Sequence, residues 1–314
     1  MSRERNEDFD KLKVALLLAH DFSGSEEEME GIKEAIWDYN NNPNVSDRNK
    51  IAPEYLSFDK LYFSTNSKTG ITTVNFNISS SFKCFDSIEG HCKVQNQIYE
   101  VIGSKLAKTD LMGCYACRDE VKSPKKLQYS FLNYVVFNTL SIEEILKQLN
   151  AYLDSHLEVD YLRFNENGCF YSFSAFEKCD LIASEINKRL LGTFSYTANK
   201  DLYKRYYNNC NMCLNLSNHQ MEGAKTTKII NPNREAILKV LRSPDMVLCC
   251  GNCTNCSYCK DKNDLRTVVF VRHGMGITES IETLLTVREY KSFLQLVKLE
   301  NAKFEATFEI ECIF

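Results

Sequence analysis

Four cysteines recur at a strict three-residue step late in the chain, and this run constrains the fold more than any other feature. They are Cys250, Cys253, Cys256 and Cys259, in the segment CCGNCTNCSYC. Most residues between them are small and polar, so the run has no apolar face with which to fill a core. Iron–sulfur clusters take ligands from short C-x2-C-x2-C runs, whereas zinc sites separate two C-x2-C pairs by a longer segment. The spacing therefore favours a [4Fe–4S] cluster over zinc, with disulfide bonding as the remaining interpretation.

A second group of cysteines lies upstream, and it ends in a C-x2-C pair within GCYACRDE. Its members are Cys84, Cys92, Cys114 and Cys117, with His91 as a possible substitute ligand. The group is expected to complete a four-thiolate metal site or to share ligands with the later run. The alternative is one metal knuckle plus two buried thiols. A third pair, Cys210 and Cys213, begins an apolar strand and is interpreted as structural.

Length and charge bound the class of protein. A chain of 314 residues has ample capacity for a core and no obstacle to being an enzyme. The formal charge of −4 gives no overall electrostatic footprint for nucleic acid, so such a contact would have to be local. Lys122, Lys125 and Lys126 are one candidate, although a short lysine run is more often a solvated loop.

The amino terminus indicates the compartment. MSRERNEDFDKLK lacks the apolar segment of a secretion signal, and no stretch is long and apolar enough to cross a bilayer. A cytoplasmic protein without membrane contact is the expectation, in the host cell if the chain is phage-encoded. In that reducing compartment the cysteines are expected to remain thiols, metal ligands or catalytic groups.

The order of strands and helices predicts an α/β fold. Residues 1–70 form an irregular N-terminal section packed on the main domain, and residues 71–314 form the cysteine-rich α/β domain. Strands are expected at ITTVNFNIS, VDYLRF, GTFSYT, CLNLS, MVLC and RTVVFV, and helices at 142–156, 176–190, 201–207 and 234–243. The alternation predicts a partial or closed β/α barrel, with an open doubly wound sheet as the main rival. The tail is expected to be a helix followed by a strand at FEATFEIECIF.

Polar residues follow every predicted strand, which places the expected site at the carboxyl ends of the strands. His273 and Tyr196 are candidates for moving protons, and Arg163 for positioning an anionic group. For His273 the alternative is an ordinary polar strand end. The phosphate loop, the dinucleotide-binding glycine fingerprint and the zinc-protease helix motif are all absent from the sequence. Nucleotide hydrolysis, Rossmann-type dehydrogenation and zincin proteolysis are therefore disfavoured.

Several short motifs, in order, resemble a phage and plasmid family called gene product 88. These are GCYAC after two upstream cysteines, RFNENGCF, FSYTANKDL, NLSNHQ, CCGNCTNC and VRHG, spread over about residues 80–275. The resemblance implies shared positions at Cys84, Cys92, Cys114, Arg163, Gly168, Tyr196, Thr197, Ser217, Cys250, Cys253, Cys256 and His273. Among these, Thr197 and Ser217 would bind a cofactor. Cys169 replaces the family's usual acidic residue, and the family brings no settled activity.

Three functions compete on this sequence. The first is an iron–sulfur-dependent enzyme of a mobile element, with a radical-SAM-like layout and a small-molecule or nucleic-acid substrate. S-adenosylmethionine is a further candidate cofactor, but the C-x3-C-x2-C motif that it requires is absent. The second is a zinc-stabilised module that binds nucleic acid or a host protein without catalysis. The third is a thiol redox protein using a pair such as Cys114 and Cys117.

Overall fold

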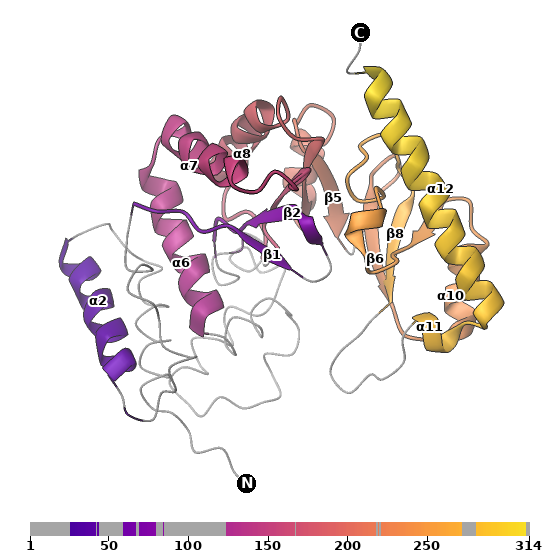
Figure 1. Ribbon diagram of the computed structural model, residues 1–314, viewed down its shortest axis with the longest axis horizontal. Helices are drawn as coiled ribbons and strands as arrows, with labels where there is room; N and C mark the ends of the chain where they lie inside the picture. The colour runs from indigo at the N-terminus through magenta and orange to yellow at the C-terminus, as the bar shows by residue number, and fades with distance from the viewer. Residues whose placement is uncertain are drawn as a thin grey trace. The chain divides into compact units, whose positions relative to one another are not determined.

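The computed structural model describes residues 26–41, 43, 59–66, 69–79, 84, 124–166, 168–217, 219, 221–271 and 281–311. The chain is a mixed α/β protein whose main element is a mostly parallel sheet (Figure 1). The described helices are α2 (Glu26–Asn41), α6 (Pro124–Thr139), α7 (Ile142–Asp154), α8 (Phe173–Ile186), α9 (Lys200–Tyr206), α10 (Arg234–Leu241), α11 (Ile281–Leu284) and α12 (Val287–Glu311). The strands are β1 (Ser64–Asn66), β2 (Gly70–Phe76), β3 (Tyr161–Phe164), β4 (Gly192–Thr197), β5 (Cys213–Ser217), β6 (Thr226–Ile230), β7 (Met246–Leu248) and β8 (Thr267–Val271).

The chain divides into two compact units, each assembled from several segments. Unit 1 comprises Met1–Phe63, Phe76–Tyr152 and Asn165–Phe176. Unit 2 comprises Ser64–Asn75, Leu153–Phe164 and Glu177–Phe314. The separate N-terminal section at residues 1–70 stays a prediction.

Amide side chains on two helices organise unit 1. Asn133 of α6 accepts the Tyr62 N–H at 2.8 Å and donates to the carbonyls of Tyr62 and Asn77, each also at 2.8 Å. Gln148 of α7 accepts the Leu61 N–H at 2.8 Å. These bonds satisfy backbone groups that an irregular segment would otherwise bury unpaired. Helix α7 itself begins with a reciprocal capping box between Ser141 and Glu144.

Unit 2 contains the sheet, in the order β1-β2-β3-β4-β5-β6-β8-β7. β1 and β2 are antiparallel, whereas the pairs β3–β4, β4–β5, β5–β6, β6–β8 and β7–β8 are parallel. The apolar strands predicted from the sequence are confirmed at β2, β3, β4, β5, β7 and β8. Parallel strands that are buried on both faces have apolar sequences, which explains why the sequence pattern predicted them.

The register of the parallel strands determines which side chains share a face of the sheet. Arg163 pairs with Phe194, Phe194 with Cys213, and Tyr196 with Asn215. Because alternate residues of a strand point to opposite faces, one face carries Tyr161, Arg163, Phe194, Tyr196, Cys213, Asn215 and Ser217. We call this the Tyr196 face. Thr197 lies on the opposite face.

Two sequence-based assignments are wrong. Lys125 and Lys126 lie in the first turn of α6 and not in a solvated loop. Pro124, which opens this helix, suits the first helical position because its fixed φ is helical and it needs no N–H partner there. The predicted C-terminal strand at FEATFEIECIF is also wrong, since α12 continues to Glu311. No glycine or proline interrupts the chain there, and alanine, lysine and glutamate are strong helix formers.

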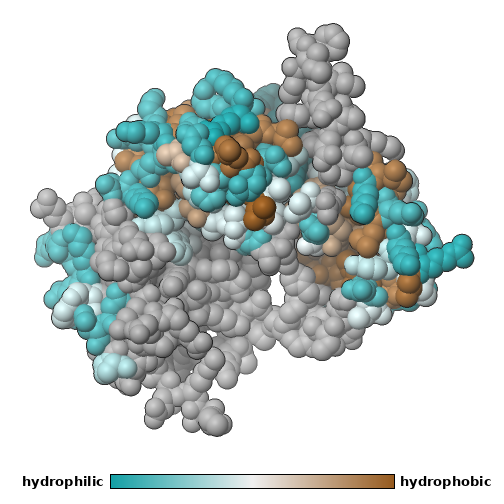
Figure 2. Space-filling view, viewed as in Figure 1, coloured by the Kyte–Doolittle hydropathy of each residue, from teal (hydrophilic) through white to brown (hydrophobic). Residues whose placement is uncertain are grey.

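Helix α12 packs on the β7–β8 side of unit 2. Its residues Phe293 and Val297 are buried in one cluster with Ile237 of α10 and Val268 of β8. The same helix exposes Leu299, and Figure 2 shows hydrophobic and hydrophilic residues interspersed around it. Among the described residues, no helix combines the length and apolar character needed to cross a bilayer.

Candidate metal centre

The cysteine run forms the connection between β7 and β8, which we call the cysteine loop (residues 249–266). These two strands are parallel neighbours, so the chain must return from the carboxyl end of β7 to the amino end of β8. Here the return contains a single short 3-10 helix, η6 (Cys253–Asn255), whose start is capped when Asn252 accepts the Thr254 N–H at 3.1 Å. Gly251 precedes it with a φ of 72°, a conformation that suits glycine.

The cysteine loop lies against the Tyr196 face. Asn215, at the centre of β5, donates from Nδ2 to the Cys259 carbonyl at 3.0 Å and to the Ser195 carbonyl at 3.1 Å. Cys259 packs against the cluster of Tyr161, Phe194 and Cys213. A run that leaves the edge strand β7 therefore reaches side chains of β3, β4 and β5.

Lys260 is a second anchor of the cysteine loop. Its Nζ lies 3.8 Å from the centroid of the Tyr161 ring, at the start of β3, and donates to the Cys253 carbonyl at 2.8 Å. Burial lowers the pKa of Lys260, while the neighbouring thiolates of Cys253, Cys256 and Cys259 act to raise it. The ammonium group thus ties the cysteine loop to the start of β3.

The third anchor is a steric contact between η6 and β2. A Cβ atom at Gly70 would lie 2.4 Å from Oγ1 of Thr254, far inside van der Waals contact. Gly70 also has a φ of 67°. Only glycine fits this position without a shift of one partner.

Backbone groups of the cysteine loop hydrogen-bond to two of its thiols. The Cys250 thiol donates to the Asn252 carbonyl at 3.2 Å, and the Cys249 sulfur accepts the Gly251 N–H at 3.4 Å. The interaction of Cys250 with Cys256 lowers the pKa of Cys250 and raises that of Cys256. Burial raises the pKa of Cys259 to about 11, against the effects of Tyr196 and of the charges on Lys225 and Arg163.

The positive charges of Arg163 and Lys225 act to lower the pKa of Cys259, and that of Lys260 lowers the pKa of Cys250. The Arg163 guanidinium lies 5.0 Å from the centroid of the Tyr196 ring, a cation–π geometry. Burial, and then the Cys259 thiolate, raise the pKa of Tyr196 well above its usual value. Positive charge at this place favours thiolates, which are the metal-binding form of cysteine.

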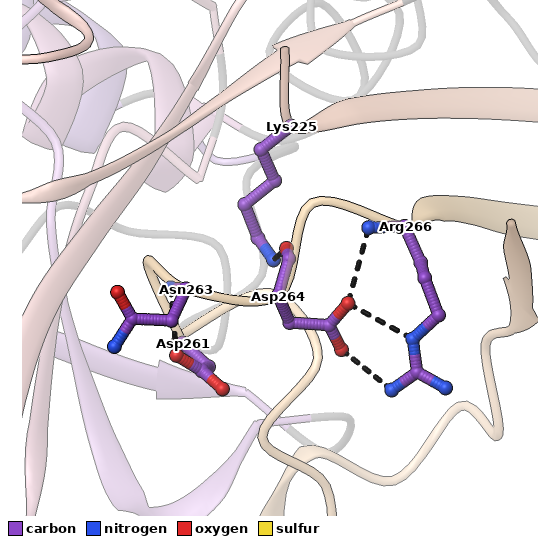
Figure 3. Close-up of polar contacts among 5 residues, drawn as sticks. All are labelled: Lys225, Asp261, Asn263, Asp264 and Arg266. Atoms are coloured by element: carbon purple, nitrogen blue, oxygen red, sulfur yellow. Dashed lines mark hydrogen bonds and ion pairs between the residues drawn. The ribbon is translucent and has the colours of Figure 1, made fainter. Parts of the chain in front are cut away.

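An ion pair holds the last part of the cysteine loop (Figure 3). The Asp264 carboxylate accepts from Nε and from a terminal nitrogen of Arg266 at 2.9 and 2.7 Å, and the Asp264 carbonyl accepts from Lys225 Nζ. Burial acts to raise the pKa of Asp264, but the Arg266 bonds and the Lys225 charge together hold it below its usual value. The carboxylate is therefore a structural anchor in its charged form.

We expect Asp264→Asn to lower the free energy of unfolding by about 1–3 kcal/mol at pH 7, since Arg266 loses a charged bidentate acceptor. The pKa of Asp264 is lower in the folded protein than in the unfolded chain, where it is about 3.9. The stability that the charged carboxylate contributes is therefore present above the unfolded pKa and is lost as the pH falls through the folded pKa. Urea unfolding at pH 7 should show a difference in the free energy of unfolding between wild type and variant. This difference should be smaller at pH 3.

Asp261→Asn is the matched control for this experiment. Oδ1 of Asp261 accepts the Asn263 N–H at 2.8 Å, and an asparagine oxygen can replace it. This variant should unfold within about 0.5 kcal/mol of wild type. Equal losses from the two variants would contradict the anchoring role of Asp264.

The structure places the predicted site residues in different surroundings. Cys250, Cys253, Cys256 and Cys259 lie in the cysteine loop, and Arg163 and Tyr196 lie beside it. Ser217 lies on the same face, where its Oγ accepts from the Thr227 hydroxyl at 3.4 Å.

Thr197 is buried on the other face, where Oγ1 accepts the Asn199 N–H at 3.1 Å in the turn into α9. Cys84 is half-buried and belongs to unit 1. His91, Cys92, Cys114, Cys117 and His273 lie outside the described residues.

Sequence reasoning missed Asn215, Lys225 and Lys260 as parts of this site. Asn215 was detectable as an amide in the middle of the apolar strand CLNLS, because a buried polar side chain requires partners. Lys260 follows the last cysteine of the run directly. Lys225 is 3% exposed, which is unusual for a lysine, but nothing in its sequence context indicates burial.

The sulfur atoms are neighbours but are not gathered around one point. Among the residues that the structure describes, no three or more His, Cys, Asp or Glu side chains form a group that could hold a metal ion. Fold and site together define an α/β protein whose thiol-rich loop crosses one face of a mostly parallel sheet. Comparison with protein-family models, with curated proteins and with solved structures found no match.

Proposed function

We propose that the cysteine loop binds a soft metal centre, a [4Fe–4S] cluster, through Cys250, Cys253, Cys256 and Cys259. The observation that carries this proposal is that these thiols share one short loop that faces the cationic side chains of Arg163, Lys225 and Lys260. Four thiolates bring a large negative charge to one place, and nearby cations offset the cost of assembling it.

The chemistry of the donors fits such a centre. Thiolates select iron–sulfur clusters, zinc and copper(I) over hard cations such as magnesium. The Cys250 thiol donates to the Asn252 carbonyl at 3.2 Å, and metal ligation would replace this bond and release the thiol proton. A cluster bound here would supply electron transfer.

The surrounding side chains support roles in binding and proton transfer. Arg163 is suited to hold an anionic group of a substrate on the Tyr196 face, and the Tyr196 hydroxyl to hold or move a proton beside Cys259. His273 keeps its proposed role in proton transfer, and it follows β8 by two residues. The resemblance to the gene product 88 family is part of the same proposal.

We further infer that the sheet of unit 2 curls into a partial barrel. Thr254 follows β7 by six residues, yet it contacts Gly70 of β2, near the opposite end of the strand order. In a flat sheet these two strands would be about 29 Å apart, at about 4.8 Å per strand. Six extended residues reach at most about 22 Å, and the 3-10 turn shortens this reach. The contact therefore supports a curled sheet around the cysteine loop.

Zinc is the second candidate, with a structural role. Cys249, Cys250, Cys256 and Cys259 pack against the buried cluster that contains Phe293 of α12. A metal bound here would tie α10 and α12 to the sheet, and structural zinc contributes folding energy outright. Such a module would bind nucleic acid or a host protein without catalysis.

Metal analysis of protein prepared without oxygen separates the two candidates. Brown protein with absorbance at about 400 nm and roughly equal iron and acid-labile sulfide supports the cluster. Colourless protein with stoichiometric zinc, which unfolds on chelation, supports the structural role. Metal-free protein from cells grown with both metals would contradict both.

A further inference from the structure

Helix α12 presents apolar side chains on two different faces. Phe293 and Val297 are buried in the cluster that contains residues of α10 and β8. Leu296 and Leu299 lie outside this cluster and are 46% and 62% exposed. Residues three apart on a helix are neighbours, so these two leucines form one exposed patch, which we call the α12 stripe. The core of unit 2 accounts for the first face but not for the stripe.

The α12 stripe has the spacing of a seam between two helices. From Leu296 to Ile310, steps of three and four residues alternate in the sequence, as they do along the contact line of a coiled coil. The five positions are Leu296, Leu299, Lys303, Ala306 and Ile310, four of them apolar. The helix has 25 residues, and Figure 1 shows its C-terminal end extending past strands β6 and β8. There is thus length along α12 for a partner helix.

The charges of α12 indicate which partner fits. Residues 287–298 contain three basic side chains and one acidic one, whereas residues 299–311 contain four acidic side chains and one basic one. The dipole of a single helix favours the opposite order, with acidic residues first, so this pattern does not serve the helix itself. A second copy of α12 running antiparallel would place each basic half beside an acidic half. A parallel copy would oppose like charges.

We propose that α12 is a homodimerisation surface, on which α12 of a second copy of this chain packs antiparallel along the stripe. Burial of Leu296 and Leu299 supplies affinity, and the charged halves set the orientation. Glu289, the one acidic residue of the basic half, is already bound within its own chain, since its carboxylate accepts from Arg234 at 2.6 Å. The basic half therefore keeps its attraction for an acidic partner.

Sedimentation equilibrium of the full chain in the presence of a reductant tests the dimer. The average mass of wild type should rise toward twice that of the monomer as the concentration increases. Leu296→Glu together with Leu299→Glu should keep the chain monomeric, with an unchanged circular dichroism spectrum, because both side chains are exposed in the monomer. Leu157→Glu is the matched control, since Leu157 is 84% exposed and lies outside α12, and it should associate as wild type does. A wild-type chain that stays monomeric, or a double variant that still dimerises, would overturn the proposal.

A charge exchange tests the orientation. The variant carries Lys291→Glu, Lys298→Glu, Glu305→Lys and Glu309→Lys in one chain, which makes the first half of α12 acidic and the second half basic. In an antiparallel pair this chain should dimerise with itself and not with wild type, because its second half and the first half of wild type are both basic. Capture of purified wild type on the tagged variant measures this. Mixed pairs that form at least as well as pairs of identical chains would contradict the antiparallel arrangement.

Discussion

Replacing Cys253 and Cys256 with alanine together should remove at least about nine-tenths of the metal that copurifies with the protein. Loss of even a residue that only supports a metal ligand costs about 10–100-fold in affinity, and this variant removes two of the four proposed thiolate ligands. Metal per chain is measured by plasma mass spectrometry on protein prepared without oxygen. The same loss is expected whether the centre is iron–sulfur or zinc.

The matched control is Cys179→Ala in α8. Cys179 is fully buried and lies outside the cysteine loop, so this variant loses a thiol and some packing but no proposed ligand. It should retain the wild-type metal content while unfolding at a lower denaturant concentration. Equal metal content in the double variant and in this control would reject the cysteine loop as the metal site.

The strands of unit 2 were predictable because a strand buried on both faces has a short, continuous apolar sequence. VDYLRF, GTFSYT and RTVVFV are short apolar runs bounded by polar residues, and each contains a strand of the sheet. β6, TTKII, lacked this signal because it begins with polar residues and exposes Lys228. The C-terminal assignment failed since alternation of Phe304, Ala306 and Phe308 also occurs within a continuous helix.

Of the candidate site, the sequence predicted the cysteines together with Arg163 and Tyr196, which lie beside the cysteine loop. The spacing of the cysteines is a local property of the sequence, and it indicated the crossover from β7 to β8 as a candidate functional segment. Asn215 and Lys225 approach this segment through strand register and folding, which a single sequence does not encode locally. Thr197 is a different case. It is a polar residue at a strand end, but its hydroxyl accepts a backbone N–H in the next turn.

Gly70→Ala should lower the free energy of unfolding by about 2–5 kcal/mol. About 1–2 kcal/mol comes from the positive φ of Gly70, which is unfavourable for any residue with a Cβ atom. The remainder, about 1–3 kcal/mol, comes from the overlap of the new Cβ with Oγ1 of Thr254. Equilibrium unfolding in urea measures the loss.

Two further variants separate the contributions at Gly70. Gly223 has a φ of 71° and nothing within 4 Å of its ideal Cβ position, so Gly223→Ala should show the backbone cost alone. Adding Thr254→Ala to Gly70→Ala removes Oγ1 and leaves only the Thr254 Cβ, at an ordinary 3.7 Å. Gly70→Ala should cost more free energy of unfolding than Gly223→Ala, and the double variant should recover most of that extra cost. If Gly70→Ala costs no more than Gly223→Ala, η6 does not lie against β2, and the support for a curled sheet around the cysteine loop is lost.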